Sequence, residues 1–291
     1  IWIASEAQNL FCYDLKEQSL RNYILTEHSL VSTNVKCLTV DNSGTIWIGF
    51  YGDGLFYSKD NLKTLHPYLS PVDNEETYND DVVSKIVLGA YNCLYISSLK
   101  GGVKELNLTS GKLRDLLLKD ENNEAIYCRT LLVYTDNELW IGTESGVYIY
   151  NLRTEKYTHL RSSEYDPYSL SDNAIYSFCK DREDGIWIGS YFGGVNYYPR
   201  SYTYFEKYYP KGIENSLHGK RVREFCRDSQ GILWIGTEDG GLNRFNLKTK
   251  DFSFFAPSAG FTNIHGLCLV DDKLWVGTFS KGLKVIDTRS G

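Results

Sequence analysis

Side chains that could bind or transform a ligand recur in short glycine-rich segments of this sequence. Glu144 lies in TESG, and Glu238 and Asp239 lie in TEDG. Two such carboxylates could flank a glycosidic bond as acid and base. Carboxylates in such turns also commonly accept hydrogen bonds from nearby backbone N–H groups, and this structural role is the alternative.

Aromatic and cationic residues occur in and around the corresponding segments of other repeats. Aromatic rings could stack on the apolar face of a sugar, and cationic side chains could bind the carboxylate or sulfate of an acidic sugar. A salt bridge between neighbouring repeats is the alternative for each cation. The candidate ligand-binding residues are Tyr51, Arg129, Tyr191, Phe192, Arg221, Arg223, Glu238, His265 and Phe279.

Motifs for catalysis and metal binding are absent from the sequence. It contains no G-x-S-x-G, no H-E-x-x-H, no C-x-x-C and no nucleotide-binding loop. The acidic stretch Ser70 to Asp81 lacks the spacing of a calcium loop. We therefore predict no catalytic residue, no metal ion and no cofactor.

The elements that must position the candidate residues come from a repeat. An aromatic residue followed by Ile-Gly or a close variant recurs about every 40 to 50 residues, a period typical of propeller blades. All six Trp residues occupy this slot. The repeats are centred on Trp2, Trp47, Tyr95, Trp140, Trp187, Trp234 and Trp275.

Each repeat reads as four antiparallel strands. In the second repeat, an alternating strand over Val35 to Val40 leads through a turn at Gly44 into TIWIGF, and a glycine-rich turn leads on to LFYS. A more polar fourth strand closes most repeats. Its copies include LRNYIL, KLRDLLL, EKYTHL, TYFEKYY and DFSFFA. The helix-like stretch Leu113 to Ile126 falls in this slot, so we predict a strand there.

These features predict an all-β fold, a β-propeller of four-stranded antiparallel blades. The repeated aromatic residue would be buried between neighbouring blades. Five Cys residues fall in first strands, where we expect small core residues without disulfides. They are Cys37, Cys128, Cys179, Cys226 and Cys268.

The first and last repeats are incomplete, since Ile1 opens on a second strand and the chain stops after a third. We predict one propeller domain over residues 1–291, seven-bladed, whose ends either pair with each other or are completed by segments outside this sequence. The absence of Met indicates a part of a longer protein.

Composition limits the partners. The formal charge is -6, and Lys and Arg are scattered among acidic residues, so a nucleic-acid surface is not expected. No apolar run approaches the ~20 residues that span a membrane. Aromatic residues in Tyr202 to Pro210 could form a homodimer contact.

The repeats resemble the two-component regulator propeller repeat. The best copies are Asp228 to Asn246 (DSQGILWIGTEDGGLNRFN), Asp181 to Tyr198 and Asp41 to Tyr57. The repeat at Tyr95 departs from the pattern with Ser97 in place of Gly, and the first repeat has Ala4.

The resemblance implies a periplasmic sensor region of a hybrid two-component histidine kinase and response regulator. Such a region would recognise an oligosaccharide and regulate polysaccharide-utilisation genes through the kinase. The membrane would be reached only through other parts of the protein, and this part would not be an enzyme. The alternatives are a glycan-active propeller enzyme with paired carboxylates and a protein-interaction scaffold.

Overall fold

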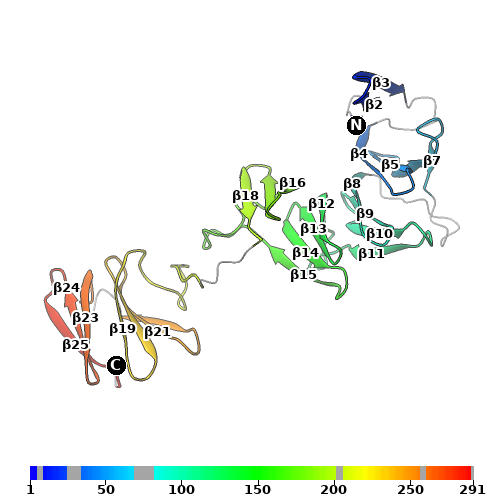
Figure 1. Ribbon diagram of the computed structural model, residues 1–291. Helices are drawn as coiled ribbons and strands as arrows, with labels where there is room; N and C mark the ends of the chain where they lie inside the picture. Colours follow the sequence, from blue (N-terminus) through cyan, green and yellow to red (C-terminus); the bar gives the residue numbers. More distant parts are fainter. Residues whose placement is uncertain (5–8, 25–33, 69–81, 201–205, 256–259, 290–291) are drawn as a thin grey trace. The chain divides into compact units, whose positions relative to one another are not determined.

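The computed structural model describes residues 1–4, 9–24, 34–68, 82–200, 206–255 and 260–289. Across these ranges the chain forms seven antiparallel sheets in sequence order and no helix (Figure 1). The prediction of an all-β fold is confirmed. In the described ranges, no helix has the length and apolar character required to cross a membrane.

The chain divides into two compact units, residues Ile1–Ser163 with Tyr168–Ser201, and Glu164–Pro167 with Tyr202–Gly291. We call them unit 1 and unit 2.

Unit 1 contains five sheets. They are β1 (Trp2–Ala4), β2 (Asn9–Asp14) and β3 (Ser19–Ile24); β4 (Val35–Val40), β5 (Ile46–Phe50), β6 (Leu55–Ser58) and β7 (His66–Pro67); β8 (Val83–Leu88), β9 (Cys93–Ser98), β10 (Val103–Asn107) and β11 (Leu113–Leu117); β12 (Cys128–Thr135), β13 (Glu138–Thr143), β14 (Gly146–Asn151) and β15 (Lys156–Leu160); and β16 (Ile175–Lys180), β17 (Ile186–Ser190) and β18 (Val195–Tyr198).

Unit 2 contains two sheets. They are β19 (Val222–Arg227), β20 (Ile232–Thr237), β21 (Gly241–Asn246) and β22 (Phe252–Phe255); and β23 (Ile264–Val270), β24 (Lys273–Thr278) and β25 (Leu283–Asp287).

The fourth strands follow the prediction with one exception. The helix-like stretch at Leu113 forms β11, as expected. The predicted strand TYFEKYY is wrong over its described part, because Glu206–Pro210 carries no strand; its first residues lie outside the described ranges.

Where another sheet of the same unit follows, the aromatic residue of the repeat packs toward that sheet. Trp140 makes edge contacts with Phe178 and Tyr198 of the next sheet, at centroid distances of 6.1 and 5.0 Å. Trp47, Tyr95, Trp140 and Trp234 are all buried.

For Trp187 and Trp275, which are 46% and 37% exposed, burial between blades stays a prediction. Each belongs to the last sheet of its unit, so no following sheet of the same unit covers it. Cys179 and Cys268 pair with these residues and are exposed for the same reason. The core role of the first-strand Cys residues is confirmed for Cys37 and Cys128, and all seven Cys residues are free.

One Asp organises the turn between the first and second strands. In the second sheet, Asp41 Oδ1 accepts hydrogen bonds from the backbone N–H groups of Ser43 and Thr45, both at 2.9 Å. Its Oδ2 accepts from Trp47 Nε1 at 2.9 Å. The same arrangement joins Asp181 to Trp187 and Asp228 to Trp234.

The glycine two positions after the repeated aromatic residue allows neighbouring sheets to approach closely. A Cβ atom on Gly142 would lie 2.8 Å from Ile175 Cγ2 of the next sheet. The same atom on Gly49 would lie 2.5 Å from Val83 Cγ1. Only glycine leaves room for these branched side chains.

Candidate ligand-binding surface

Every first strand begins with a β-bulge at the same position. In β16, Ile175 pairs with Ser190 and Ser177 with Gly189, which leaves Tyr176 as the extra residue. A bulge of this kind turns a side chain away from the regular alternation of the strand. We call these extra residues the bulge residues: Lys36, Ser84, Arg129, Tyr176, Arg223 and His265.

A backbone hydrogen bond places the end of each second strand beside the bulge. The N–H of Glu144 donates to Tyr127 O at 3.1 Å, and the N–H of Tyr191 donates to Ala174 O at 2.9 Å. The equivalent donors in the other sheets are Tyr51, Leu99, Glu238 and Phe279. The second-to-third turns and the links into the first strands therefore share one face within each sheet, as predicted. We call this the bulge face.

In unit 1 the bulge face of two neighbouring sheets carries a continuous row of side chains. The guanidinium of Arg129 pairs with Glu144 and lies 4.8 Å from the ring centroid of Tyr176. Tyr176 stacks on Tyr191 at 5.0 Å and 22°, and Phe192 meets Tyr191 edge-on at 4.4 Å. Tyr191 is 59% and Phe192 87% exposed. We call Tyr176, Tyr191 and Phe192 the aromatic platform.

Asp172 holds the turn that carries the platform. Its Oδ2 accepts a hydrogen bond from Phe192 N at 2.9 Å, and its Oδ1 accepts from Ala174 N at 3.2 Å. These two backbone hydrogen bonds, the first being the larger effect, keep the pKa of Asp172 below its usual value. Asp172 is therefore charged at neutral pH and ties the link before β16 to the turn after β17.

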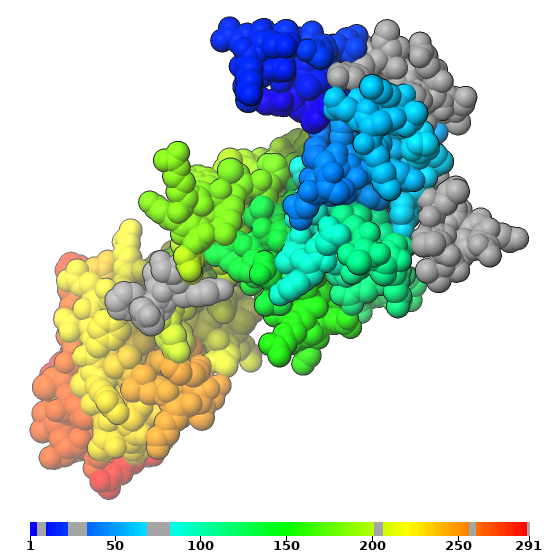
Figure 2. All heavy atoms as spheres, turned by 45° about the vertical axis from the view of Figure 1, so that its right-hand side comes forward, coloured from blue at the N-terminus to red at the C-terminus, as the bar shows by residue number. Residues whose placement is uncertain are grey.

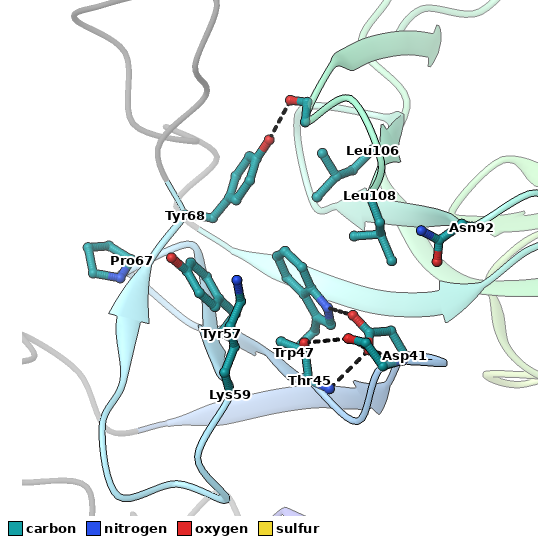
Figure 3. Close-up of a pocket in the computed structure, with 12 residues that line it drawn as sticks. Asp41, Thr45, Trp47, Tyr57, Lys59, Pro67, Tyr68, Asn92, Leu106 and Leu108 are labelled. Carbon is teal, nitrogen blue, oxygen red and sulfur yellow. Dashed lines mark hydrogen bonds between the residues drawn. The ribbon is translucent and has the colours of Figure 1, made fainter.

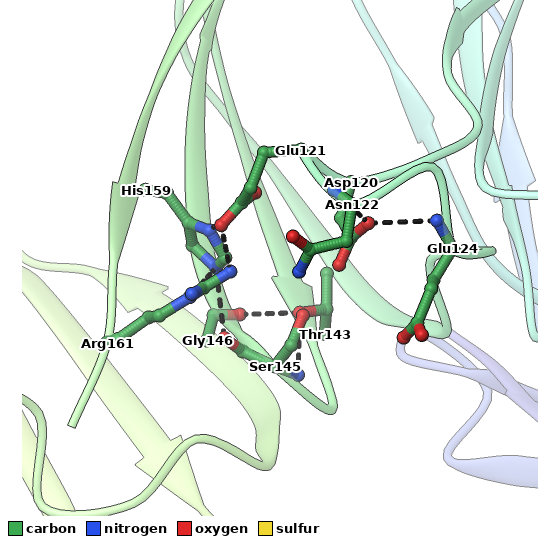
Figure 4. Close-up of polar contacts among 9 residues, drawn as sticks. All are labelled: Asp120, Glu121, Asn122, Glu124, Thr143, Ser145, Gly146, His159 and Arg161. Atoms are coloured by element: carbon green, nitrogen blue, oxygen red, sulfur yellow. Dashed lines mark hydrogen bonds and ion pairs between the residues drawn. The ribbon is translucent and has the colours of Figure 1, made fainter.

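A second polar network supports the turn that carries Glu144 (Figure 4). Ser145 N donates to Thr143 Oγ1 at 3.0 Å, and His159 Nε2 lies 2.9 Å from Ser145 O. Since a carbonyl oxygen can only accept, His159 carries a proton on Nε2. Its Nδ1 lies 3.5 Å from Glu121 Oε2, while burial lowers the pKa of His159. A partly buried imidazole thus supports the turn.

Tyr51, the remaining candidate of unit 1, stands beside another bulge residue. Lys36 Nζ lies 5.6 Å from the centroid of the Tyr51 ring. Among the described residues, no ring contact joins Tyr51 to the aromatic platform.

In unit 2 all five candidates lie together. Glu238 Oε1 accepts from Arg223 Nη1 at 2.9 Å, and its Oε2 lies 3.7 Å from Arg221 Nη1. Arg223 Nη2 lies 3.4 Å from His265 Nδ1, and the His265 ring lies 5.3 Å from that of Phe279. Ion pairs therefore form within one sheet, and Arg223 also reaches the next sheet.

The carboxylates considered for glycoside hydrolysis have other partners. Glu144 and Glu238 pair with arginines, and Asp239 accepts from the backbone N–H groups of Lys220 at 3.0 Å and Arg221 at 3.1 Å. Those backbone hydrogen bonds lower the pKa of Asp239, whereas a general acid needs a raised pKa. No group of three His, Cys, Asp or Glu side chains suited to a metal ion occurs in the described ranges. The acidic stretch Ser70 to Asp81 lies entirely outside those ranges.

Sequence reasoning missed Tyr176, Lys36 and Asp172. A signal for the first two was present, because Arg129 and His265 were already candidates at the second position of a first strand. The same position in β16 is Tyr176. Asp172 had no comparable signal, since only the folded turn brings Phe192 N to its carboxylate.

Comparisons with solved structures define the fold as a β-propeller. The extracellular domain of a hybrid two-component system from B. thetaiotaomicron is 24% identical, with a TM-score of 0.66 over 100% of this chain and 44% of that one. The extracellular domain of a second hybrid system from this organism is 17% identical, with a TM-score of 0.58 over 99% of this chain and 45% of that one. Virginiamycin B lyase from Staphylococcus aureus is 16% identical, with a TM-score of 0.50 over 97% of this chain and 89% of that one. This chain thus spans less than half of the two extracellular domains.

The repeats themselves match the two-component regulator propeller family over residues 29–52, 169–192 and 216–239. All three segments contain candidate residues, among them Tyr51, Tyr191 and Arg223. No curated protein matches the sequence significantly. The resemblance to this repeat family is therefore confirmed.

Proposed function

We propose that this chain is a ligand-sensing propeller from the periplasmic region of a hybrid two-component signalling protein, and that its ligand is an oligosaccharide. The exposed aromatic platform beside the Arg129–Glu144 pair carries this proposal. The regulator-propeller repeats and the likeness to extracellular domains of two hybrid two-component systems support it.

The chemistry of the platform fits a sugar chain. Sugar rings present an apolar C–H face, and rings that stack on exposed aromatic side chains remove that face from water. Arg129 offers N–H donors and Glu144 offers acceptor oxygens directly beside Tyr176, so hydroxyl groups of a stacked sugar would find both. Asp172 and the network behind Glu144 hold both turns before a ligand arrives, which lowers the entropic cost of binding.

Unit 2 would contribute recognition of an acidic sugar. Arg221 and Arg223 share a single carboxylate, Glu238, so the cluster carries an excess of positive charge. A uronic acid or sulfate could replace Glu238 as partner of one guanidinium. Binding would then change the output of the kinase and the expression of polysaccharide-utilisation genes.

Isothermal titration of this chain with oligosaccharides of defined length tests the site. We expect saturable binding by at least one, and we expect Tyr191→Ala to weaken it about fivefold or more, since stacking with one aromatic ring contributes of order 1 kcal/mol or above.

Tyr91→Ala is the matched control, because Tyr91 is 80% exposed in the β8–β9 turn at the opposite strand ends. Equal losses in the two variants would contradict a specific role for the platform. Absence of binding by every oligosaccharide, to this chain and to the complete sensor region, would refute the proposed ligand class.

A further inference from the structure

A cavity of about 480 Å³ lies between the second and third sheets of unit 1, within the usual size range of ligand sites (Figure 3). These two sheets pack directly on each other, and Figure 2 shows them side by side in blue, cyan and teal. The side chains that line the cavity include Asp41, Trp47, Tyr57, Lys59, Tyr68 and Leu106.

The cavity lies at the strand ends opposite to the bulge face. Asp41 follows β4 and Lys59 follows β6, whereas the bulge residues stand where β4 and β8 begin. A ligand in this cavity would therefore not contact the proposed sugar-binding surface.

A difference between repeats explains why the space is open. Around Trp140, the ring of Tyr134 lies at 6.2 Å and that of Tyr198, from the next sheet, at 5.0 Å. Tyr198 pairs with Ile186, the residue before the repeated aromatic of the fifth sheet. In the third sheet the equivalent pair is Leu106 and Leu94, so Leu106 occupies the position of Tyr198. A smaller residue thus faces Trp47 where a tyrosine faces Trp140.

The cavity has aromatic walls suited to a ring. Trp47 lies 5.4 Å from Tyr57 and 5.8 Å from Tyr68 by ring centroids. The Tyr68 hydroxyl donates to Gly111 O at 2.8 Å, which fixes that ring. A six-membered ring with an apolar face would gain contacts with all three side chains.

The cavity contains one cation that could pair with an anion. Asp41 is ionised, and its oxygens already accept four hydrogen bonds, from Ser43 N, Ser43 Oγ, Thr45 N and Trp47 Nε1. Lys59 is the one cation among the lining residues. It makes no ion pair with another described residue, and its Nζ lies 5.6 Å from the Tyr57 ring.

We propose that this cavity binds a monocyclic carboxylate, with its ring packed in the cavity against Trp47 and Tyr57 and its carboxylate at Lys59. The shared chemistry is a six-membered ring bearing one carboxylate, and its source is either a uronate sugar or an aromatic acid.

Titration of the ¹⁵N-labelled protein with glucuronate and with benzoate tests this site. The readout is the Trp47 indole N–H resonance, assigned with Trp47→Phe. We expect a saturable shift with at least one carboxylate and about tenfold weaker binding of its neutral counterpart, methyl glucoside or benzyl alcohol. The responding acid identifies the source.

Two variants make the test specific. Leu106→Tyr places in the cavity the residue that the chain itself uses at Tyr198, and it should abolish the shift. Lys59→Gln changes an exposed side chain and should reduce carboxylate binding to the level of the neutral compound. Tyr191→Ala, on the bulge face, should leave the titration unchanged whether or not oligosaccharides bind there.

Three results would overturn the proposal. They are no shift with either acid, an unchanged affinity in Leu106→Tyr, and equal affinities for the acid and its neutral counterpart. A failed oligosaccharide titration would not bear on this site, because the two sites share no residue.

Discussion

At the residue scale, the repeated Asp does more than close a turn. Asp228 is 6% exposed and accepts hydrogen bonds from two backbone N–H groups and from Trp234 Nε1. One carboxylate thus satisfies the turn and orients the largest core side chain of the blade. Buried polar groups left without a partner are costly, so this position should be sensitive to substitution.

We expect Asp228→Ala to lower the free energy of unfolding by about 2–4 kcal/mol, because three N–H donors lose their acceptor. Asp228→Asn, which keeps one acceptor oxygen, should lose less. Urea denaturation followed by tryptophan fluorescence measures both. Equal stability of Asp228→Ala and the parent protein would show that water replaces the carboxylate.

The pH dependence of ligand binding should follow Asp172. The pKa of Asp172 is lowered in the folded protein. Its stabilisation of the platform turn is therefore complete above the usual pKa of 3.8 and is lost as the pH falls through the lower, folded-state pKa. We expect oligosaccharide affinity to be constant from about pH 7 to about pH 5 and to fall only in stronger acid.

Asp172→Asn provides the comparison in calorimetry at each pH. It should bind more weakly at neutral pH, because its amide accepts the Phe192 N–H less strongly than a carboxylate does. A loss of affinity between neutral pH and pH 5 in the parent protein would assign the titration to another group.

At the element scale, the glycine after the repeated aromatic residue sets how closely sheets pack. In the third sheet Ser97 replaces this glycine. The fourth sheet, which faces Ser97, begins its first strand with Cys128. The sheets that face a glycine begin this strand with a branched residue, Val83 in the third sheet and Ile175 in the fifth. Ser84 Oγ lies 2.8 Å from Ser97 Oγ and 2.9 Å from Cys128 O, so the exchange of glycine for serine coincides with a smaller and more polar neighbour.

This compensation predicts coupling between two substitutions. Gly142→Ser alone should destabilise by about 1–3 kcal/mol, because its Cβ would lie 2.6 Å from Thr130 Cγ2 and 2.8 Å from Ile175 Cγ2. Gly142→Ser with Ile175→Cys reproduces the Ser97–Cys128 pair and should be less destabilised than the sum of the single variants, by about 0.5–3 kcal/mol.

Ile264→Cys supplies the control for this cycle, since Ile264 faces Gly236 and not Gly142. Its combination with Gly142→Ser should be additive in denaturant unfolding. Additivity of the Gly142–Ile175 pair as well would reject steric compensation between sheets.

The bulges are the other feature of this scale, and sequence could not reveal them. An alternating strand pattern shows which residues face the core, but one inserted residue reverses every side chain before it. The first strands were therefore predicted correctly, while the exposed position of Tyr176 was not recognised. Arg129 and Arg223 became candidates only because they stand near strand starts.

At the scale of the whole molecule, the chain forms two compact units, each built from complete or nearly complete blades. The prediction of one seven-bladed ring over residues 1–291 remains a prediction, as does the homodimer. Tyr208, from the segment considered for that contact, packs within its own unit against Phe245 at 4.7 Å.

The sequence alone determined the repeat period, the order of the strands, the turn glycines and the slot of the aromatic core residue. These properties follow from local backbone preferences and from alternation, which act over a few residues. The tertiary structure decided which side chains meet. The Arg129–Tyr176 contact, the Asp172 hydrogen bond to Phe192 and the cavity beside Leu106 all depend on contacts between distant parts of the chain, which no local pattern encodes.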